Sequence, residues 1–291
     1  MGLHRVNAHI ILVITIIVSA VIASIFIFPP NESVRELFGV LSFLYGIFVA
    51  FAISNSSARF SKVVEKLETE EAFLLYIYTM SALLGARVQK KTQALIDDYL
   101  ISQLDHFLKD YRLTYPHFLK IFQFYIKDVR PEKGDELQKE AFEDIIDTLK
   151  TLMENRKQIE LNIQDTMTKL EWVCIGALLS LLLFAIFYMN SGTLLSIVLS
   201  VLLATTAVVF VAILWELNML KWKDQKWVWA DLTILFQQLD LMPYYPKEAL
   251  LMGKVDIQNV KKARVATYLY PYPNFSDKKI EIIENPSYNK K

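Results

Sequence analysis

Four apolar runs without any formal charge constrain this chain more than any other feature. They span residues 8–28, 37–54, 172–189 and 194–214. A helix of about 20 apolar residues crosses the hydrocarbon core of a bilayer. A buried helix of a soluble protein normally keeps a charged stripe toward water. The sequence therefore predicts an all-α integral membrane protein with four transmembrane helices.

The first run is also compatible with a cleaved signal peptide, because a short basic stretch precedes it. Its apolar part is too long for the core of such a peptide, however. It ends in Phe28-Pro29-Pro30 rather than in the small residues of a cleavage site. We therefore expect a retained transmembrane helix.

Basic residues mark one side of the membrane. Arg59, Lys62 and Lys66 follow the second run, and further lysines follow the fourth. Tryptophans 172, 215, 222, 227 and 229 gather at the same ends, where indoles favour the headgroup boundary. Because positive charge stays on the cytoplasmic side, we expect a multi-pass protein of the cell (plasma or inner) membrane with both termini cytoplasmic.

This layout divides the chain into four parts. Residues 1–54 hold the first two transmembrane helices, 55–171 form a cytoplasmic helical insert, 172–216 hold the last two transmembrane helices, and 217–291 form a cytoplasmic tail. The tail is expected to contain an amphipathic stretch at 227–241 and then an extended end, with the residues from Lys278 onward solvated and disordered.

Net charge excludes some partners and hints at one contact. The 31 basic and 31 acidic residues cancel, which argues against a nucleic-acid binder. Insert and tail carry opposite net charges, −3 (17 basic, 20 acidic) for 55–171 and +3 (12 basic, 9 acidic) for 216–291. Their attraction favours docking of the tail on the insert, although screening weakens it.

The sequence of the insert predicts helices along most of its length. No glycine or proline interrupts the chain between the second apolar run and Gly85, and another uninterrupted helix is expected from Glu136 straight into the third run. Two transmembrane helices thus extend into a cytoplasmic stalk. Arg156 interrupts the apolar seam of the second stalk helix, and a lone buried guanidinium requires a partner. We expect a salt bridge to Glu68 or Glu71; the alternative is an anion site in a cytoplasmic vestibule.

Signals for an enzyme are missing from the sequence. It contains no nucleotide-binding glycine loop, nucleophile elbow or zinc-protease motif. The single Cys174 is expected to be an apolar filler. The adjacent acids Glu70-Glu71 and Asp97-Asp98 are expected on solvated helix faces, and Asp105 beside His106 is expected to be a surface pair. We expect no metal site, no cofactor and no catalytic residue.

The second apolar run has one regular face. Gly39, Phe43 and Ile47 recur at every fourth position, and Gly46 on a neighbouring face permits close helix contact. A plain interpretation is that these side chains face lipid or sister helices.

The sequence of the second apolar run and of the residues after it also resembles that of a known family. The run L-S-F-L-Y-G-I-F-V-A-F, followed by S-N-S-S-A-R-F and E-K-L-E-T-E-E-A, resembles the second transmembrane helix of the bestrophin-like membrane domain family and its cytoplasmic continuation. The layout is similar as well: two spans, a helical insert, N-R-K at residues 155–157 before the third span, then a fourth span and a tail. The resemblance covers about residues 10–245.

Bestrophins are pentameric anion channels whose second helices line the pore, so the resemblance implies a homo-oligomeric ring in a lipid bilayer that passes inorganic anions such as chloride. It assigns Phe43 and Ile47 to a hydrophobic pore neck, with Gly39 at the outer turn, where such a ring gates by dewetting. The inner mouth would then be formed by Ser54, Asn55, Ser56, Ser57 and Arg59. The family's paired tryptophans after this helix and its acidic calcium clasp have no counterpart here, so calcium gating is not carried over.

Two rivals to passive anion conduction stay open. In the first, the protein is a membrane-anchored sensor or effector whose cytoplasmic stalk binds a partner and whose spans only anchor it. In the second, a secondary transporter, ionisable residues or broken helices would be expected inside the spans, and the sequence offers only Glu216 at an inner edge.

Overall fold

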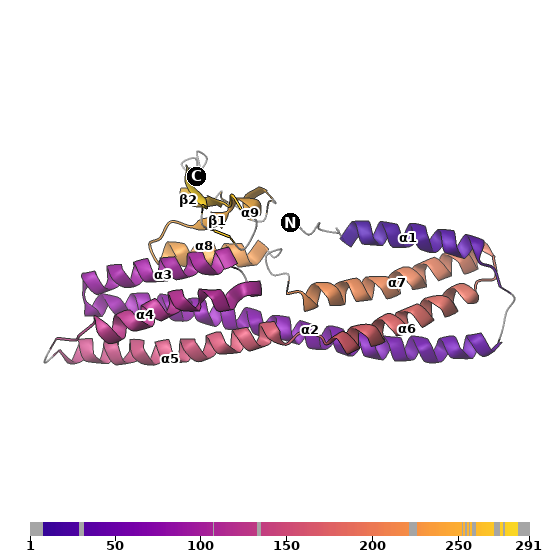
Figure 1. Cartoon of the computed structure of the whole chain (residues 1–291), viewed down its shortest axis with the longest axis horizontal. Coiled ribbons are helices and arrows are strands. Elements are labelled where there is room, and N and C mark those ends of the chain that lie inside the picture. The colour runs from indigo at the N-terminus through magenta and orange to yellow at the C-terminus, as the bar shows by residue number, and fades with distance from the viewer. Residues whose placement is uncertain are drawn as a thin grey trace. The chain divides into compact units, whose positions relative to one another are not determined.

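A computed structural model describes residues 8–28, 32–106, 108–132, 135–220, 226–251, 253, 255, 257, 260–270, 274–275 and 277–284. Both termini therefore lie outside the described residues. The chain is mostly helical (Figure 1) and divides into two compact units. Unit 1 comprises Met1–Ser61 and Asp165–Leu220, and unit 2 comprises Lys62–Gln164 and Lys221–Lys291. Insert and tail thus belong to one unit.

Unit 1 is built from four helices: α1 (Ala8–Ile25), the first part of α2 (Glu32–Ser81), α6 (Lys169–Tyr188) and α7 (Leu194–Asn218). Three helical segments among the described residues, those containing α2, α6 and α7, are long and apolar enough to cross a membrane. The described apolar stretch of α1, Leu12–Ile25, is shorter.

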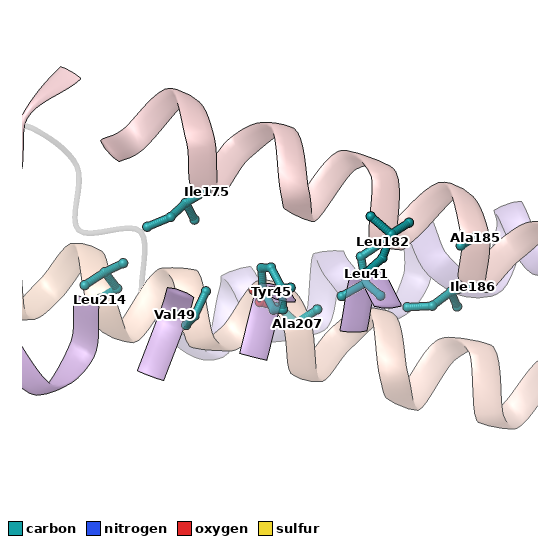
Figure 2. Packing of buried hydrophobic residues seen from close by; sticks show 9 residues of the cluster. All are labelled: Leu41, Tyr45, Val49, Ile175, Leu182, Ala185, Ile186, Ala207 and Leu214. Carbon is teal, nitrogen blue, oxygen red and sulfur yellow. Dashed lines mark hydrogen bonds between the residues drawn. The ribbon is translucent and has the colours of Figure 1, made fainter. Parts of the chain in front are cut away.

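The core of unit 1 lies where α2, α6 and α7 pack together. Figure 2 shows its nine buried side chains, which are Leu41, Tyr45, Val49, Ile175, Leu182, Ala185, Ile186, Ala207 and Leu214. The hydroxyl of Tyr45 donates to the carbonyl of Ala207 at 2.5 Å, so the one polar group of this cluster is satisfied by a backbone oxygen.

The turn between α6 and α7 holds the end of α1. Asn190 is fully buried and its amide donates to the carbonyls of Ala23 and Phe26. Gly192 has a φ of +76°, and a Cβ there would lie 2.9 Å from Ile27. Only glycine combines this backbone conformation with so close an approach.

Unit 2 contains the rest of α2, then η1 (Ala82–Leu84), α3 (Ala86–His106), η2 (Leu108–Thr114), α4 (Tyr115–Lys127), α5 (Glu136–Gln164), α8 (Lys226–Gln238) and α9 (Lys247–Leu251). Its tail adds a sheet of order β1-β2-β3, formed by Tyr244–Pro246, Lys262–Thr267 and Lys279–Glu284. Strand β2 pairs in parallel with β1, Tyr244 opposite Arg264, and antiparallel with β3, Lys262 opposite Glu284.

Several expectations are confirmed and others are wrong. The prediction that the second apolar run continues without a break is confirmed, because α2 is a single helix of 50 residues. The predicted uninterrupted helix from Glu136 into the third run is wrong, because α5 ends at Gln164 before α6 begins at Lys169. Thr168 and Glu171 form a capping box that starts α6 afresh. The chain is mostly helical, but the all-α prediction missed the three-stranded sheet of the tail. Of the end expected to be solvated and disordered, Lys279–Glu284 form the exposed strand β3, and residues 285–291 lie outside the described residues.

The tryptophan belt is only partly retained. Trp172 and Trp215 contact each other in unit 1, with ring centroids 5.3 Å apart. Trp229 is instead buried in unit 2, 2% exposed, against Tyr245. Trp222 and the side chain of Trp227 lie outside the described residues.

Candidate functional site

Within unit 1, helix α2 has one packed side and one side that the protomer leaves exposed. Leu41, Tyr45 and Val49 form the packed side, at most 7% exposed. Phe43 and Ile47, the residues assigned by resemblance to a pore neck, are 67% and 38% exposed. The protomer therefore leaves large apolar side chains uncovered on a helix whose other face it buries. In a membrane protein such a face contacts lipid, contacts another subunit or lines a hydrophobic pore.

Gly39 continues the Phe43–Ile47 stripe by one turn. A Cβ built on it meets no described atom within 4 Å, so the fold of the protomer does not require glycine there. The stripe thus consists of one open position followed by two large apolar side chains. Its first member adds no side chain that could narrow a path along this face.

The polar residues that follow the stripe separate into two groups. Ser54, Asn55 and Ser57 are exposed, whereas Ser56 and Arg59 are only 5% and 6% exposed. The five residues expected to form one inner mouth therefore do not all share a free surface in the protomer.

Arg59 connects α2 to two other segments of unit 1. Its guanidinium donates to the carbonyls of Asp165, in the break before α6, and of Asn218, the last residue of α7. The side chain of Asn218 in turn accepts from the backbone N–H of Met167 at 3.1 Å. Carbonyls at a helix C-terminus and in a loop lack helical partners, so Arg59 satisfies two of them at once.

A groove of about 880 Å³ opens beside the Phe43–Ile47 stripe. Its α2 wall combines the larger residues Tyr45, Val49 and Ile53 with small ones, and its α7 wall includes Leu203 and Phe210. The small α2 residues are Ser42, Gly46, Ala50, Ser54, Ser57, Ala58 and Ser61. The lining is predominantly apolar, with hydroxyl groups concentrated toward one end. Sequence reasoning singled out Gly46 on this face but gave no indication of a groove.

In unit 2, Arg156 forms the centre of a buried polar cluster. Its guanidinium lies 3.6 Å from the carboxylate of Glu70, and both side chains are at most 4% exposed. It donates to the hydroxyls of Tyr111, at 3.3 Å, and Thr114, at 2.9 Å. The rings of Tyr99, Tyr111 and Phe118 lie 4.5–5.3 Å from the guanidinium carbon, within cation–π range.

The predicted partners of Arg156, Glu68 and Glu71, are both wrong: the ion pair is made by Glu70. Glu70 shares one stripe of α2 with Val63, Leu74 and Ile77, all at most 1% exposed. The spacing of these apolar residues was a signal in the sequence that could have identified Glu70. The expectation of a solvated Glu70 is wrong for the same reason.

Donors surround the Glu70 carboxylate. The hydroxyls of Tyr99 and Tyr111 and the amide of Gln103 all donate to it. Burial raises the pKa of Glu70, and Arg156, Tyr111 and Gln103 oppose this rise. Burial also lowers the pKa of Arg156. The pair is a structural salt bridge closed off from solvent, which gives an anion no free surface of the guanidinium to bind.

Glu71 lies beside this cluster without entering it. Burial, together with the nearby carboxylates of Asp231, Glu70 and Glu68, raises its pKa to about 8. Asp231 belongs to α8 and Glu71 to α2. A carboxyl group with that pKa is mostly protonated at neutral pH.

The tail is attached to α3 by charged side chains. Arg264 of β2 forms two hydrogen bonds to Asp97, of 2.6 and 2.7 Å. Asp105, 5% exposed, accepts from Tyr244, Tyr268 and Lys278. The docking suggested by the opposite net charges of insert and tail is therefore present, while the expected solvated positions of Asp97 and Asp105 are wrong.

No set of metal ligands occurs in the part of the chain that the structure describes, because no three His, Cys, Asp or Glu side chains gather there. The uncovered α2 face and its groove are features of unit 1 that packing within the protomer does not explain.

Comparison with known proteins identifies the class. A model of the bestrophin-like domain matches residues 7–219, so the chain belongs to the bestrophin-like family. The matched range covers residues 7–61 and 165–219 of unit 1, together with the whole insert. No curated protein sequence matches the chain.

Two solved structures share the fold. One is a single-substitution variant of a bacterial bestrophin homologue from Klebsiella pneumoniae, with a TM-score of 0.55 and 14% identity over 73% of this chain and 89% of that one. The other is a single-substitution variant of a membrane protein, with a TM-score of 0.56 and 14% identity over 81% of this chain and 100% of that one.

Proposed function

We propose that this protein is an ion channel that conducts small inorganic anions, such as chloride, passively across the cell membrane. In the proposed assembly, identical subunits surround an axial path lined by α2, with a pentamer favoured by family membership. All four helices of unit 1 span the bilayer, and insert, tail and both termini face the cytoplasm. The protein performs no chemical conversion.

One observation carries this proposal: α2 exposes Phe43 and Ile47 while it buries its opposite side in the protomer. Five copies of such a face around an axis make an apolar constriction, which gates by losing and regaining water. Exposed Ser54, Asn55 and Ser57 follow on the cytoplasmic side and offer hydrogen-bond donors to an anion.

The experiment is anion efflux from proteoliposomes loaded with chloride. The wild type is expected to release chloride, and Phe43→Ala combined with Ile47→Ala is expected to increase the efflux several-fold, because a wider and less apolar neck lowers the dewetting barrier. Val13→Ala combined with Ile17→Ala, two exposed apolar positions on α1, is the matched control and should behave like the wild type. Absence of efflux from the wild type, or efflux unaltered by the neck substitutions, would overturn the proposal.

A membrane-anchored effector is the second candidate. It is favoured by the compactness of unit 2, which has its own core and presents β3 as an edge strand whose residues are all classed as exposed. An unpaired strand edge is a surface on which another chain can add a strand. A protein that is dimeric in nanodiscs and releases no chloride fits this candidate and excludes the channel.

A further inference from the structure

We propose that strand β3 pairs with β3 of a second copy of this chain, in an antiparallel, twofold contact that has Ile280 on its axis. The contact goes beyond the proposed function. It is separate from the ring of that function, because a twofold contact uses the same surface on both copies and joins them in pairs.

The sheet of the tail has an open edge at β3. The strand order is β1-β2-β3, and among the described residues β3 pairs with β2 alone. All six residues of β3 are exposed, including Ile280 (45%) and Ile282 (61%). An uncovered strand edge that carries large apolar side chains is a surface on which another strand can be added.

The geometry of antiparallel pairing limits the possible registers. The peptide groups of two directly opposite residues either both point toward the other strand or both point away from it. These directions alternate along β3, so in a twofold contact a residue lies opposite itself or opposite one that is an even number of positions away. The axis therefore passes through a residue, and the central choices in β3 are Ile280, Glu281 and Ile282.

Charge selects one of these three registers. An axis at Glu281 places two carboxylates directly opposite each other, which is unfavourable. An axis at Ile282 places Glu281 opposite Ile283 and forms no ion pair. An axis at Ile280 places Ile280 opposite itself and Lys279 opposite Glu281 of the other copy. Two ion pairs then flank one apolar pair, and both kinds of cross-strand pair stabilise a sheet.

The charges that this register uses are not engaged within the protomer. Glu284, at the end of β3, forms an ion pair with Lys262 of β2. Lys279 and Glu281 form no ion pair with any residue in the part of the chain that the structure describes. Because these two charges complement a copy of the same strand, they favour a second copy of this chain over a foreign peptide as the occupant of the edge.

Disulfide cross-linking of the intact chain in detergent micelles tests the register. On a Cys174→Ser background, Ile280→Cys is expected to link two copies on oxidation, because directly opposite Cα atoms lie about 4.5–5.5 Å apart, within disulfide range. Ile282→Cys is the matched control: residue 282 is more exposed, but its two copies would lie about 14 Å apart along the strands. It should give at most a tenth of the yield, and an equal or higher yield would overturn the proposal.

Charge reversal gives an independent readout, because each chain supplies both members of the two ion pairs. On the Ile280→Cys background, Glu281→Lys alone or Lys279→Glu alone places like charges opposite each other and should lower the cross-linking yield at least fivefold. The two reversals together restore both ion pairs and should restore at least half of the yield. Glu143→Lys, the same change at an exposed position of α5, is the control and should leave the yield unchanged.

Single reversals without effect, or a double reversal that stays as low as the single ones, would overturn the inference. Absence of any cross-link from Ile280→Cys would overturn it as well, and would leave the edge of β3 to a chain other than this one. Chloride efflux decides the proposed function separately, since neither cross-linking result depends on conduction.

Discussion

Unit 1 leaves many large apolar side chains exposed, such as Phe43, Phe51 and Leu194, whereas the surface of unit 2 carries ion pairs such as that of Lys150 with Asp147. The two units also differ in how their buried polar side chains are paired. In unit 1 the buried side chains of Tyr45 and Asn190 donate to backbone carbonyls, whereas unit 2 buries a full ion pair, Glu70 with Arg156.

This difference follows from the surroundings of each unit. Lipid tails cannot hydrogen-bond, so a helical unit in a bilayer pairs its buried polar groups internally, and burial of apolar side chains contributes little to its stability. In a unit that folds in water, burial of apolar side chains drives folding and a charge inside needs a partner of opposite sign, as Glu70 and Arg156 provide in unit 2. The following substitutions test whether each unit depends on the contacts that this comparison assigns to it.

The largest effect is expected from Arg156→Ala in unit 2. It leaves the Glu70 carboxylate buried without its cation, and breaking a buried pair costs about 3–5 kcal/mol. Native-state hydrogen exchange of α3 and α4 measures the loss. Lys157→Ala, whose pair with Glu160 is exposed on the lysine side, is the control and should change stability by less than about 0.5 kcal/mol. Similar small effects of both substitutions would contradict the buried ion pair.

Arg59→Ala in unit 1 is expected to rank second. Two carbonyls lose a charged donor, and a hydrogen bond to a charged group contributes about 1.5–3 kcal/mol. Thermal unfolding in nanodiscs measures the loss, and exposed Lys62→Ala is the control. Arg59→Lys separates two roles: it retains the positive charge of a pore mouth but not the fork that reaches two carbonyls. Full rescue of stability by lysine would contradict the structural role.

The carboxyl group of Glu71 makes the stability of unit 2 depend on pH. Its pKa of about 8 exceeds that of an unfolded glutamate, so the folded state holds a proton that the unfolded state releases. Stability from this group is present at low pH and is lost as the pH rises from about 5 through 8, by roughly 2 kcal/mol after allowance for partial solvent access. Glu71→Gln should flatten this decline in denaturation experiments, and an unchanged slope would contradict the shift.

The smallest effect is expected where the tail meets α3. Arg264→Ala removes the ion pair with Asp97, which is held by two hydrogen bonds and whose side chains are about one-fifth exposed. The loss should weaken attachment of the tail to α3 by about 1–2 kcal/mol. Faster hydrogen exchange in β1 and β2 is the readout. Lys262→Ala, which removes the exposed pair with Glu284, serves as control. Equal exchange in both variants would mean that Arg264 does not hold the tail.

Sequence patterns identified the long features of this fold and missed features that depend on contacts. Charge-free runs located the helices of unit 1, and the lack of breakers predicted the continuous α2. The break after Gln164 was missed because residues 165–168 contain neither glycine nor proline; the capping box at Thr168 and Glu171 was the local signal that could have indicated it.

The candidate site was predictable only in part. Periodicity identified Phe43 and Ile47, but the position of Arg59 depends on the carbonyls of Asp165 and Asn218, which lie more than 100 residues away in sequence. The β-sheet of the tail was missed because its short strands are scattered among prolines, and their pairing depends on residues distant in the chain.

The central claim is that the Phe43–Ile47 stripe faces an aqueous axial path, while the other exposed apolar faces of unit 1 contact lipid. Reaction of single cysteines with a membrane-impermeant, anionic thiol reagent tests it directly, on the Cys174→Ser background in proteoliposomes. Phe43→Cys and Ile47→Cys should react at least tenfold faster than Ile17→Cys, and the reaction should block chloride efflux. Reaction of all three cysteines at the same slow rate, with efflux unaffected, would contradict the account.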